Sequence, residues 1–328
     1  MRLIRPARAR LALLLLAAPL VPLLPLSPAA ATAGPDCSTV SEQGTSGQTR
    51  VPLDFSGSPL GQMQVPEATA ALAARGVTPG TGVDVAIIDS GVSSKAAPQR
   101  AGFTDLTGAS RTSGLAYYLG TVMASIVATP AYPGADGGPI GIAPGARITD
   151  VRAYQSPTAQ EGTGVVTPTA DTIAAGLEWA LANRAVVDIA VVGAPTAGSV
   201  RLQTVVQRLE AKGVIIVAAT GVPTETAGSS TDASSAPQVA ASYPADYPGV
   251  IAVGTPVGSD SSVTYPADPD TTVAGASAGL MSLGLDGQPC VVSAPSTAVA
   301  AASVAGDRKS TRLNSSHRCI SYAVFCLK

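Results

Sequence analysis

The chain has 328 residues, of which 46% are hydrophobic and only 13% are charged, with a formal net charge of −2. Two terminal segments described below hold 9 of the 20 basic residues but one of the 22 acidic residues, so the remainder carries a charge of −10. An acidic surface argues against binding to nucleic acid or anionic membranes, and the length suits one large domain with an ample core.

The N-terminal segment, residues 1–33, has the composition of a secretory signal peptide. Four arginines precede an apolar run at residues 11–18, and small residues follow as far as Ala33. This order predicts cleavage after Ala31 or Ala33. A membrane anchor is the alternative, but three prolines interrupt a stretch that barely reaches the roughly 20 residues needed to span a bilayer. We therefore expect an exported protein.

Residues 34–66 are rich in glycine, serine and proline and show little hydrophobic periodicity. We expect them to form an extended N-terminal arm, followed by a domain over residues 67–306. Outside the terminal segments there are two cysteines, Cys37 in the arm and Cys290 in the domain. An even pair in an exported protein predicts a disulfide. Two free thiols remain the alternative, because the sequence does not report the distance between the two Cα atoms.

The domain alternates between short apolar runs and helical patterns. Residues 169–183 and 200–212 place apolar side chains on one helical face, and Gly213 is a typical helix C-terminal signal. Runs rich in β-branched residues predict buried strands at residues 83–88, 146–151, 186–192, 214–219 and 250–253. Alternating strands and helices predict an α/β fold with a mostly parallel central sheet and helices on both of its faces.

The chain reads VAIIDSGV at residues 85–92, LGTVMA at residues 119–124 and STAVAA at residues 296–301. These three segments resemble, in order, the aspartate, histidine and serine motifs of the subtilisin-like serine proteases (subtilases). The family's catalytic aspartate is kept as Asp89. Leu119 stands at the histidine position, and Ala298 stands at the position of the serine nucleophile. Neighbouring Ser296 and Ser303 are not expected to replace that serine, because one precedes the reactive position and the other lies farther along the helix.

A fourth segment, residues 214–222, resembles the loop that carries the family's oxyanion asparagine. Val222 stands at the asparagine position, and the well-matched residues 243–254 downstream support this register. In subtilisin, removing members of the triad lowers turnover by about 10⁴–10⁶, and losing the oxyanion amide costs about 10²–10³. The resemblance therefore implies a degenerate catalytic centre made of Asp89, Leu119, Ala298 and Val222.

Within the family the chain is most similar to mycosins, the subtilases associated with type VII secretion. The similarity implies an exported or cell-surface pseudoprotease that acts as a binding or scaffold protein, with a peptide or a secretion-machinery protein as its partner. An active serine endopeptidase is the alternative that family membership alone implies. We expect no cofactor, no metal and no nucleic acid, and membrane contact only through a C-terminal anchor of the mycosin type.

The C-terminal segment, residues 307–328, matches the translation of a sequencing-library adapter. We therefore interpret it as an artefact and the domain as truncated near Gly306. A genuine basic tail is the alternative. His317, the single histidine of the sequence, falls in this segment. No imidazole is then left in residues 1–306 to serve a catalytic triad.

Overall fold

The computed structural model describes residues 34–44, 59–96, 100–108, 114–130, 140–159, 164–183, 186–221, 224–225, 242–256, 263–264 and 268–310. The predicted signal peptide, residues 1–33, and residues 311–328 of the C-terminal segment lie outside the described residues. None of the described helices is long and apolar enough to cross a membrane.

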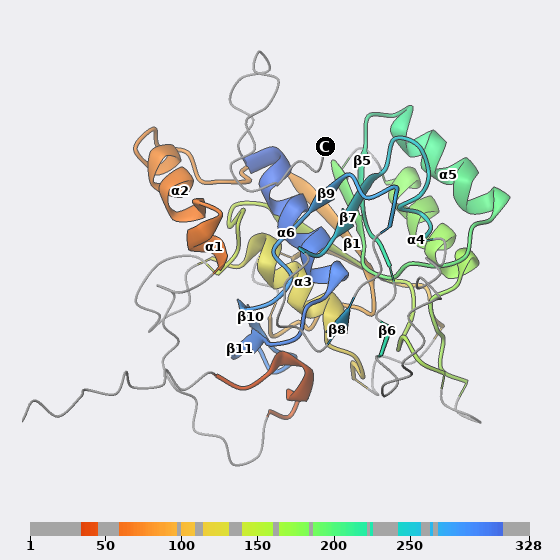
Figure 1. The fold of residues 1–328 in the computed structure, drawn as a ribbon, viewed down its shortest axis with the longest axis horizontal. Coiled ribbons are helices and arrows are strands. Elements are labelled where there is room, and N and C mark those ends of the chain that lie inside the picture. Colours follow the sequence, from red (N-terminus) through yellow and green to blue (C-terminus); the bar gives the residue numbers. More distant parts are fainter. Residues whose placement is uncertain are drawn as a thin grey trace, which may run out of the picture. The chain divides into compact units, whose positions relative to one another are not determined.

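A seven-stranded parallel sheet forms the centre of the fold (Figure 1). Each neighbouring pair of strands in it is parallel, which confirms the predicted α/β architecture. The strand order is β2-β3-β1-β4-β5-β7-β9. The strands are β1 (Asp84–Asp89), β2 (Arg100–Asp105), β3 (Arg147–Arg152), β4 (Ile189–Val192), β5 (Ile215–Ala219), β7 (Ile251–Gly254) and β9 (Val273–Ala274).

Five of these strands lie within or next to the predicted apolar runs. Four of them are apolar at nearly every position, as strands covered on both faces usually are. β3 is the exception, since its sequence is RITDVR. The two edge strands, β2 and β9, were not predicted. β2 alternates between partly buried and exposed residues and contains arginine, glycine and aspartate. β9 has only two residues. Neither strand has the continuous apolar run by which the central strands are found in the sequence.

Helices cover both faces of the sheet, as the pattern of β1 shows. Val85 and Ile87 belong to one buried cluster together with α3 (Leu119–Ala128) and α6 (Thr297–Ser310). Ala86 and Ile88 belong to a second cluster with α4 (Ala170–Ala182) and α5 (Val200–Glu210). Alternate side chains of a strand point to opposite faces, so α3 and α6 lie on one face and α4 and α5 on the other.

The ends of α4 and α5 follow from local sequence signals. The Thr169 hydroxyl accepts a hydrogen bond from Thr172 N, and the Thr172 hydroxyl accepts one from Thr169 N, which makes a capping box. Ser199 caps α5 by accepting from Leu202 N at 3.1 Å. Gly213, with φ of +80°, lies beyond the end of α5 as predicted, in a backbone region that favours glycine.

The N-terminal arm is attached to the domain. Cys37, in the short helix η1 (Cys37–Thr39), forms a disulfide with Cys290, and the two Cα atoms are 5.0 Å apart. Cys290 lies in a hairpin of β10 (Leu280–Leu283) and β11 (Pro289–Val292). The arm also contacts the loop before α3, because Glu42 Oε1 accepts a hydrogen bond from Leu115 N at 3.1 Å.

The second half of the arm differs from the expected extended chain. Residues 59–66 contain α1 (Pro59–Gln62) and the start of α2 (Val65–Ala73). Proline is well suited to the first turn of a helix, where its missing N–H would have no partner. The prolines that suggested an irregular arm therefore begin helices here.

A further short antiparallel pair joins β6 (Thr224–Glu225) to β8 (Val263–Thr264).

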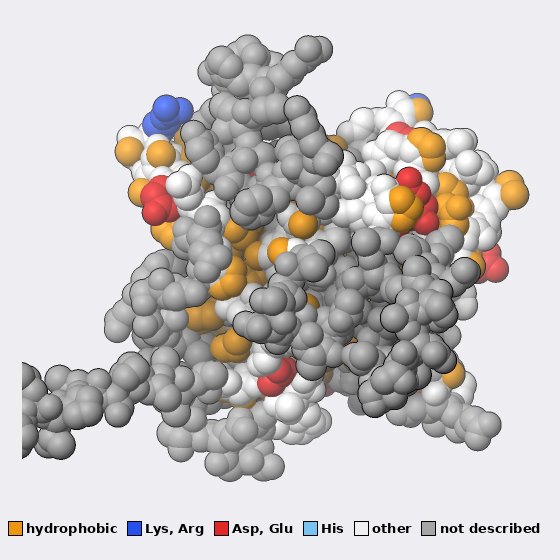
Figure 2. All heavy atoms as spheres, viewed as in Figure 1, with side chains coloured by type: hydrophobic (Ala, Val, Ile, Leu, Met, Phe, Trp, Pro, Cys, Tyr) orange, Lys and Arg blue, Asp and Glu red, His pale blue; other side chains and the backbone are white. Residues whose placement is uncertain are grey.

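The described surface carries few charges, in keeping with the composition. On the face drawn in Figure 2, the described Lys and Arg side chains are scattered and form no basic patch. α6 continues to Ser310, four residues into the segment that we interpret as an adapter translation.

Candidate functional site

Asp89 is the last residue of β1 and is fully buried. It points to the α3 and α6 face, because it has the same parity along the strand as Val85 and Ile87. Its Oδ1 accepts hydrogen bonds from Ser90 N at 2.7 Å and from Ser90 Oγ at 3.0 Å. Burial raises the pKa of Asp89, although the hydrogen bonds of Ser90 and Tyr154 favour its charged form.

Tyr154 is the residue near Asp89 that the sequence did not indicate. It is fully buried just after β3, and burial together with the charge of Asp89 raises the pKa of its hydroxyl well above the usual value. The Tyr154 hydroxyl lies close enough to the Asp89 carboxyl group to favour its charged form. Asp89 Oδ2 nevertheless has no partner of full hydrogen-bond geometry among the described residues. No motif includes Tyr154, so only the fold relates these two side chains.

A buried arginine next to Asp89 does not neutralise it. Arg152 is the parallel register partner of Asp89 across β1 and β3, and it is only 1% exposed. Its guanidinium bonds to Asp105 at the edge of the sheet, with Nη1 and Oδ2 3.1 Å apart. The polar neighbours of the Asp89 carboxyl group are therefore Ser90 and Tyr154, while Arg152 is paired with Asp105.

Leu119 is the first residue of α3 and packs, partly buried, against the apolar cluster of that face. The start of α3 contacts the turn after β1 closely. Gly120 N donates to Ser90 Oγ at 3.2 Å, and a Cβ on Gly120 would lie 2.5 Å from the carbonyl oxygen of Gly91. The backbone junction between the aspartate turn and the helix is thus present, while the side chain at the histidine position is a hydrocarbon.

Ala298 is the second residue of α6, is 3% exposed and belongs to the same apolar cluster as Leu119. The two nearby serines have structural partners. Ser296 Oγ accepts from Val299 N at 3.4 Å at the start of the helix, and Ser303 Oγ, fully buried, donates to Ala300 O at 2.8 Å. The three triad positions therefore present a carboxylate, a leucine and an alanine.

The oxyanion position is only partly described, because Val222 lies outside the described residues. Thr220 and Gly221, which precede it, connect the end of β5 to residues 242–254, the part of the chain that supports the register of this match. Gly221 N donates to Ser242 Oγ at 2.8 Å, and Thr220 N donates to Val253 O at 2.9 Å. The peptide bond between Tyr243 and Pro244 is cis.

Gly193, directly after β4, leaves room for the retained aspartate. A Cβ on Gly193 would clash with Asp89 Oδ2 and would lie 2.7 Å from the sulfur of Met123. Val191 and Val192, which precede it in β4, are both fully buried. Gly193 is therefore a steric requirement of the aspartate position.

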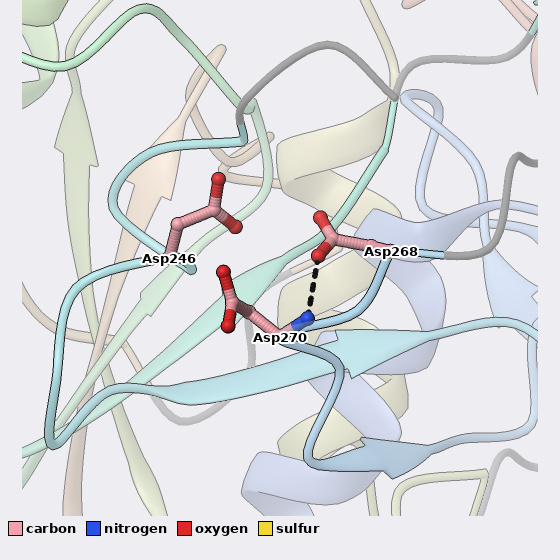
Figure 3. Close-up of side chains that lie close together, drawn as sticks. All are labelled: Asp246, Asp268 and Asp270. Atoms are coloured by element: carbon pink, nitrogen blue, oxygen red, sulfur yellow. Dashed lines mark hydrogen bonds between the residues drawn. The ribbon is translucent and has the colours of Figure 1, made fainter. Parts of the chain in front are cut away.

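Carboxylates that could hold a metal ion lie elsewhere in the described residues. Asp246, Asp268 and Asp270 bring one carboxylate oxygen each within 4.8 Å of the others (Figure 3). None of the triad positions belongs to this group.

Comparison with known proteins shows which proteins the chain is similar to. No family model matches the chain. Subtilisin E of Bacillus subtilis (strain 168) is 32% identical over 117 residues, which are 36% of this chain and 26% of that protein. The subtilisin of Bacillus pumilus is 31% identical over 117 residues, which are 36% of both chains. The matched part therefore spans between a quarter and about a third of these curated relatives.

Solved structures extend the likeness to most of the chain. The MycP3 protease from the type VII (ESX-3) secretion system has a TM-score of 0.56 at 21% identity and covers 86% of this chain and 84% of its own. MycP1 from Mycobacterium smegmatis has a TM-score of 0.56 at 22% identity and covers 84% and 79%. The chain thus has the subtilisin-like fold, and 117 of its residues are similar in sequence to subtilisins. A cold-adapted subtilisin-like serine proteinase, with a TM-score of 0.52 at 21% identity over 70% of this chain, shows the same fold. The chain therefore has the architecture that the resemblance of its three motifs predicted.

Proposed function

We propose that this subtilase homologue is an exported pseudoprotease that acts as a binding or scaffold protein. One observation carries the proposal. The backbone junction of the catalytic centre is kept through Asp89, Ser90 and Gly120, whereas Leu119 and Ala298 supply neither a base nor a nucleophile. A serine protease needs both groups in contact, because a serine hydroxyl is a weak nucleophile without an adjacent base.

The proposal includes export and a link to secretion. The composition of residues 1–33 supports export, and the disulfide between Cys37 and Cys290 fits an oxidising compartment. The similarity in fold to a protease from a type VII secretion system supports a secretion-machinery protein or a peptide as the partner. Contact with a membrane would then run through a C-terminal anchor of the mycosin type.

An active serine endopeptidase is the second candidate function, and the identity of 31–32% with subtilisins favours it. The two candidates make opposite predictions for one experiment. Purified protein is incubated with a fluorophosphonate probe and with unfolded casein, with subtilisin E as the positive control. We expect neither labelling nor cleavage. Labelling that disappears when one serine of this chain is replaced would establish the endopeptidase instead.

A binding role also requires a stable fold, which a decaying gene product would lose. The central strands β1, β4 and β5 are buried and apolar throughout, apart from Asp84 and Asp89 at the two ends of β1. We expect the protein to unfold in a single sharp thermal transition. A broad, non-cooperative profile in that protein would indicate decay rather than a retained binding function.

A further inference from the structure

The first part of the N-terminal arm is fixed to the hairpin of β10 and β11. Cys37 is joined to Cys290 by the disulfide, and Pro35 O accepts a hydrogen bond from Val291 N at 2.9 Å. Val40 is 3% exposed and packs in the same buried cluster as Cys37. These contacts anchor the arm as far as Val40, and the residues that follow reach two loops beside the aspartate turn.

Glu42 is the residue of the arm that binds both loops. Its Oε1 accepts a hydrogen bond from Leu115 N at 3.1 Å, in the loop before α3. Its backbone carbonyl accepts one from Lys95 Nζ at 2.7 Å, in the loop after β1. A Cβ on Gly114 would lie 2.5 Å from Glu42 Oε2, so the glycine at this position lets the carboxylate come close. Glu42 therefore ties the two loops together.

The loop before α3 is also tied to the aspartate turn. A Cβ on Gly91 would lie 2.9 Å from Leu115 Cδ2, so the leucine side chain covers the backbone of the turn. Tyr117 O accepts a hydrogen bond from Ser90 Oγ at 3.3 Å. The chain then enters α3 at Leu119. The loop thus has the arm as its partner on one side and the turn of the retained aspartate on the other.

The contacts of Glu42 can open without unfolding the domain. Lys95 is exposed and Glu42 is half-buried, so water can replace their hydrogen bonds at a low cost in free energy. The anchor differs, because Cys37 and Cys290 are fully buried and covalently joined. An arm that stays anchored while Glu42 is released remains at a high local concentration and binds again readily.

We propose that the arm is a strap with Glu42 as its latch, and that the closed latch orders the loop before α3 beside the degenerate catalytic centre. Opening the latch leaves this loop tied to the aspartate turn alone, which loosens the approach to Leu119 while the sheet stays folded. The inference does not depend on the proposed function, because the loop borders the same centre in a binding protein and in an endopeptidase.

The competing explanation is that the arm stabilises the whole domain and has no local effect. Hydrogen–deuterium exchange of the full-length protein, read by mass spectrometry after labelling for seconds to minutes, separates the two cases. Glu42→Ala removes the acceptor of the Leu115 amide, and a hydrogen bond to a charged group corresponds to about 10- to 100-fold in an opening equilibrium. We expect residues 114–118 to take up deuterium at least about tenfold faster in Glu42→Ala, while α5 stays largely unlabelled in both proteins.

Two further variants test whether the effect belongs to the Glu42 carboxylate. Gln43→Ala is the matched control, since Gln43 is the exposed neighbour of Glu42 in the arm, and it should label like the wild type. Glu42→Gln keeps an acceptor oxygen but loses the charge, so its loop should label at a rate between those of the wild type and Glu42→Ala. Unchanged labelling of residues 114–118 in Glu42→Ala, the same acceleration in Gln43→Ala, or equally fast labelling of α5 would overturn the proposal.

Discussion

The Ser90 hydroxyl accepts a hydrogen bond from Gly120 N at 3.2 Å, and the same hydroxyl donates to Asp89 Oδ1 at 3.0 Å. A serine therefore connects the retained aspartate to the first turn of α3, the helix that begins with Leu119. The connection uses the Asp89 carboxylate, the Ser90 hydroxyl and the backbone of Gly120, so it does not require a histidine at the helix start.

Restoring the nucleophile alone should restore little activity. Ala298→Ser places a hydroxyl at the start of α6, but no base is available to accept its proton. We expect fluorophosphonate labelling of Ala298→Ser to be about 100-fold or more slower than labelling of the double variant Leu119→His/Ala298→Ser, since general-base catalysis contributes about 10²–10⁴. The measurement is the rate of label incorporation. Equal rates in the two variants would mean that another group acts as the base.

The buried carboxyl of Asp89 should make stability depend on pH. Burial raises its pKa in the folded protein above its usual value of 3.8. The folded state therefore holds this proton more tightly than the unfolded state. The resulting stabilisation is fully present below pH 3.8 and is lost as the pH rises through the higher folded pKa.

Asp89→Asn tests this pH dependence. Asparagine keeps an oxygen that can accept from Ser90, but it has no charge to bury. Urea unfolding at several pH values should show that the free energy of unfolding of the variant, relative to the wild type, increases between pH 4 and pH 7. A difference that stays constant over this range would show that Asp89 does not change its protonation between the two states.

The disulfide between Cys37 and Cys290 should stabilise the domain strongly. It closes a loop with a sequence separation of 253 residues, which corresponds to roughly 5 kcal/mol in the chain-entropy model. Mass spectrometry of a non-reduced digest should detect the linked peptides, and reduction should lower the Tm. Two alkylatable thiols in protein exported through an oxidising compartment would contradict the pairing. A Cys37→Ser/Cys290→Ser variant whose Tm no longer responds to reductant is the control.

Gly120 should tolerate no side chain. A Cβ at this position would lie 2.5 Å from a backbone oxygen of Gly91, and neither backbone segment can move without disturbing the junction. We expect Gly120→Ala to lower the free energy of unfolding by roughly 1–3 kcal/mol. Gly102→Ala is the matched control, because the nearest atom to a Cβ there is 3.8 Å away. Equal effects of the two substitutions on the denaturant midpoint would refute this steric explanation.

The sequence by itself determined the class of fold and the identities at the catalytic positions. Buried strands such as β1 and β4 are apolar at nearly every position, so their runs are visible locally, and their alternation with helices implies a parallel sheet. Asp89, Leu119 and Ala298 are found by motif order, which needs no coordinates.

Only the tertiary structure decided which side chains meet. Tyr154 lies near Asp89 because β3 pairs with β1, and the carboxylates of Asp246, Asp268 and Asp270 converge because β7 pairs with β9. The edge strand β2 and the helices within residues 59–66 were likewise missed, since their patterns are irregular or rich in proline. Local composition encodes burial and backbone preference, whereas contacts between distant segments depend on the order and register of the strands, and no short stretch of sequence contains that information.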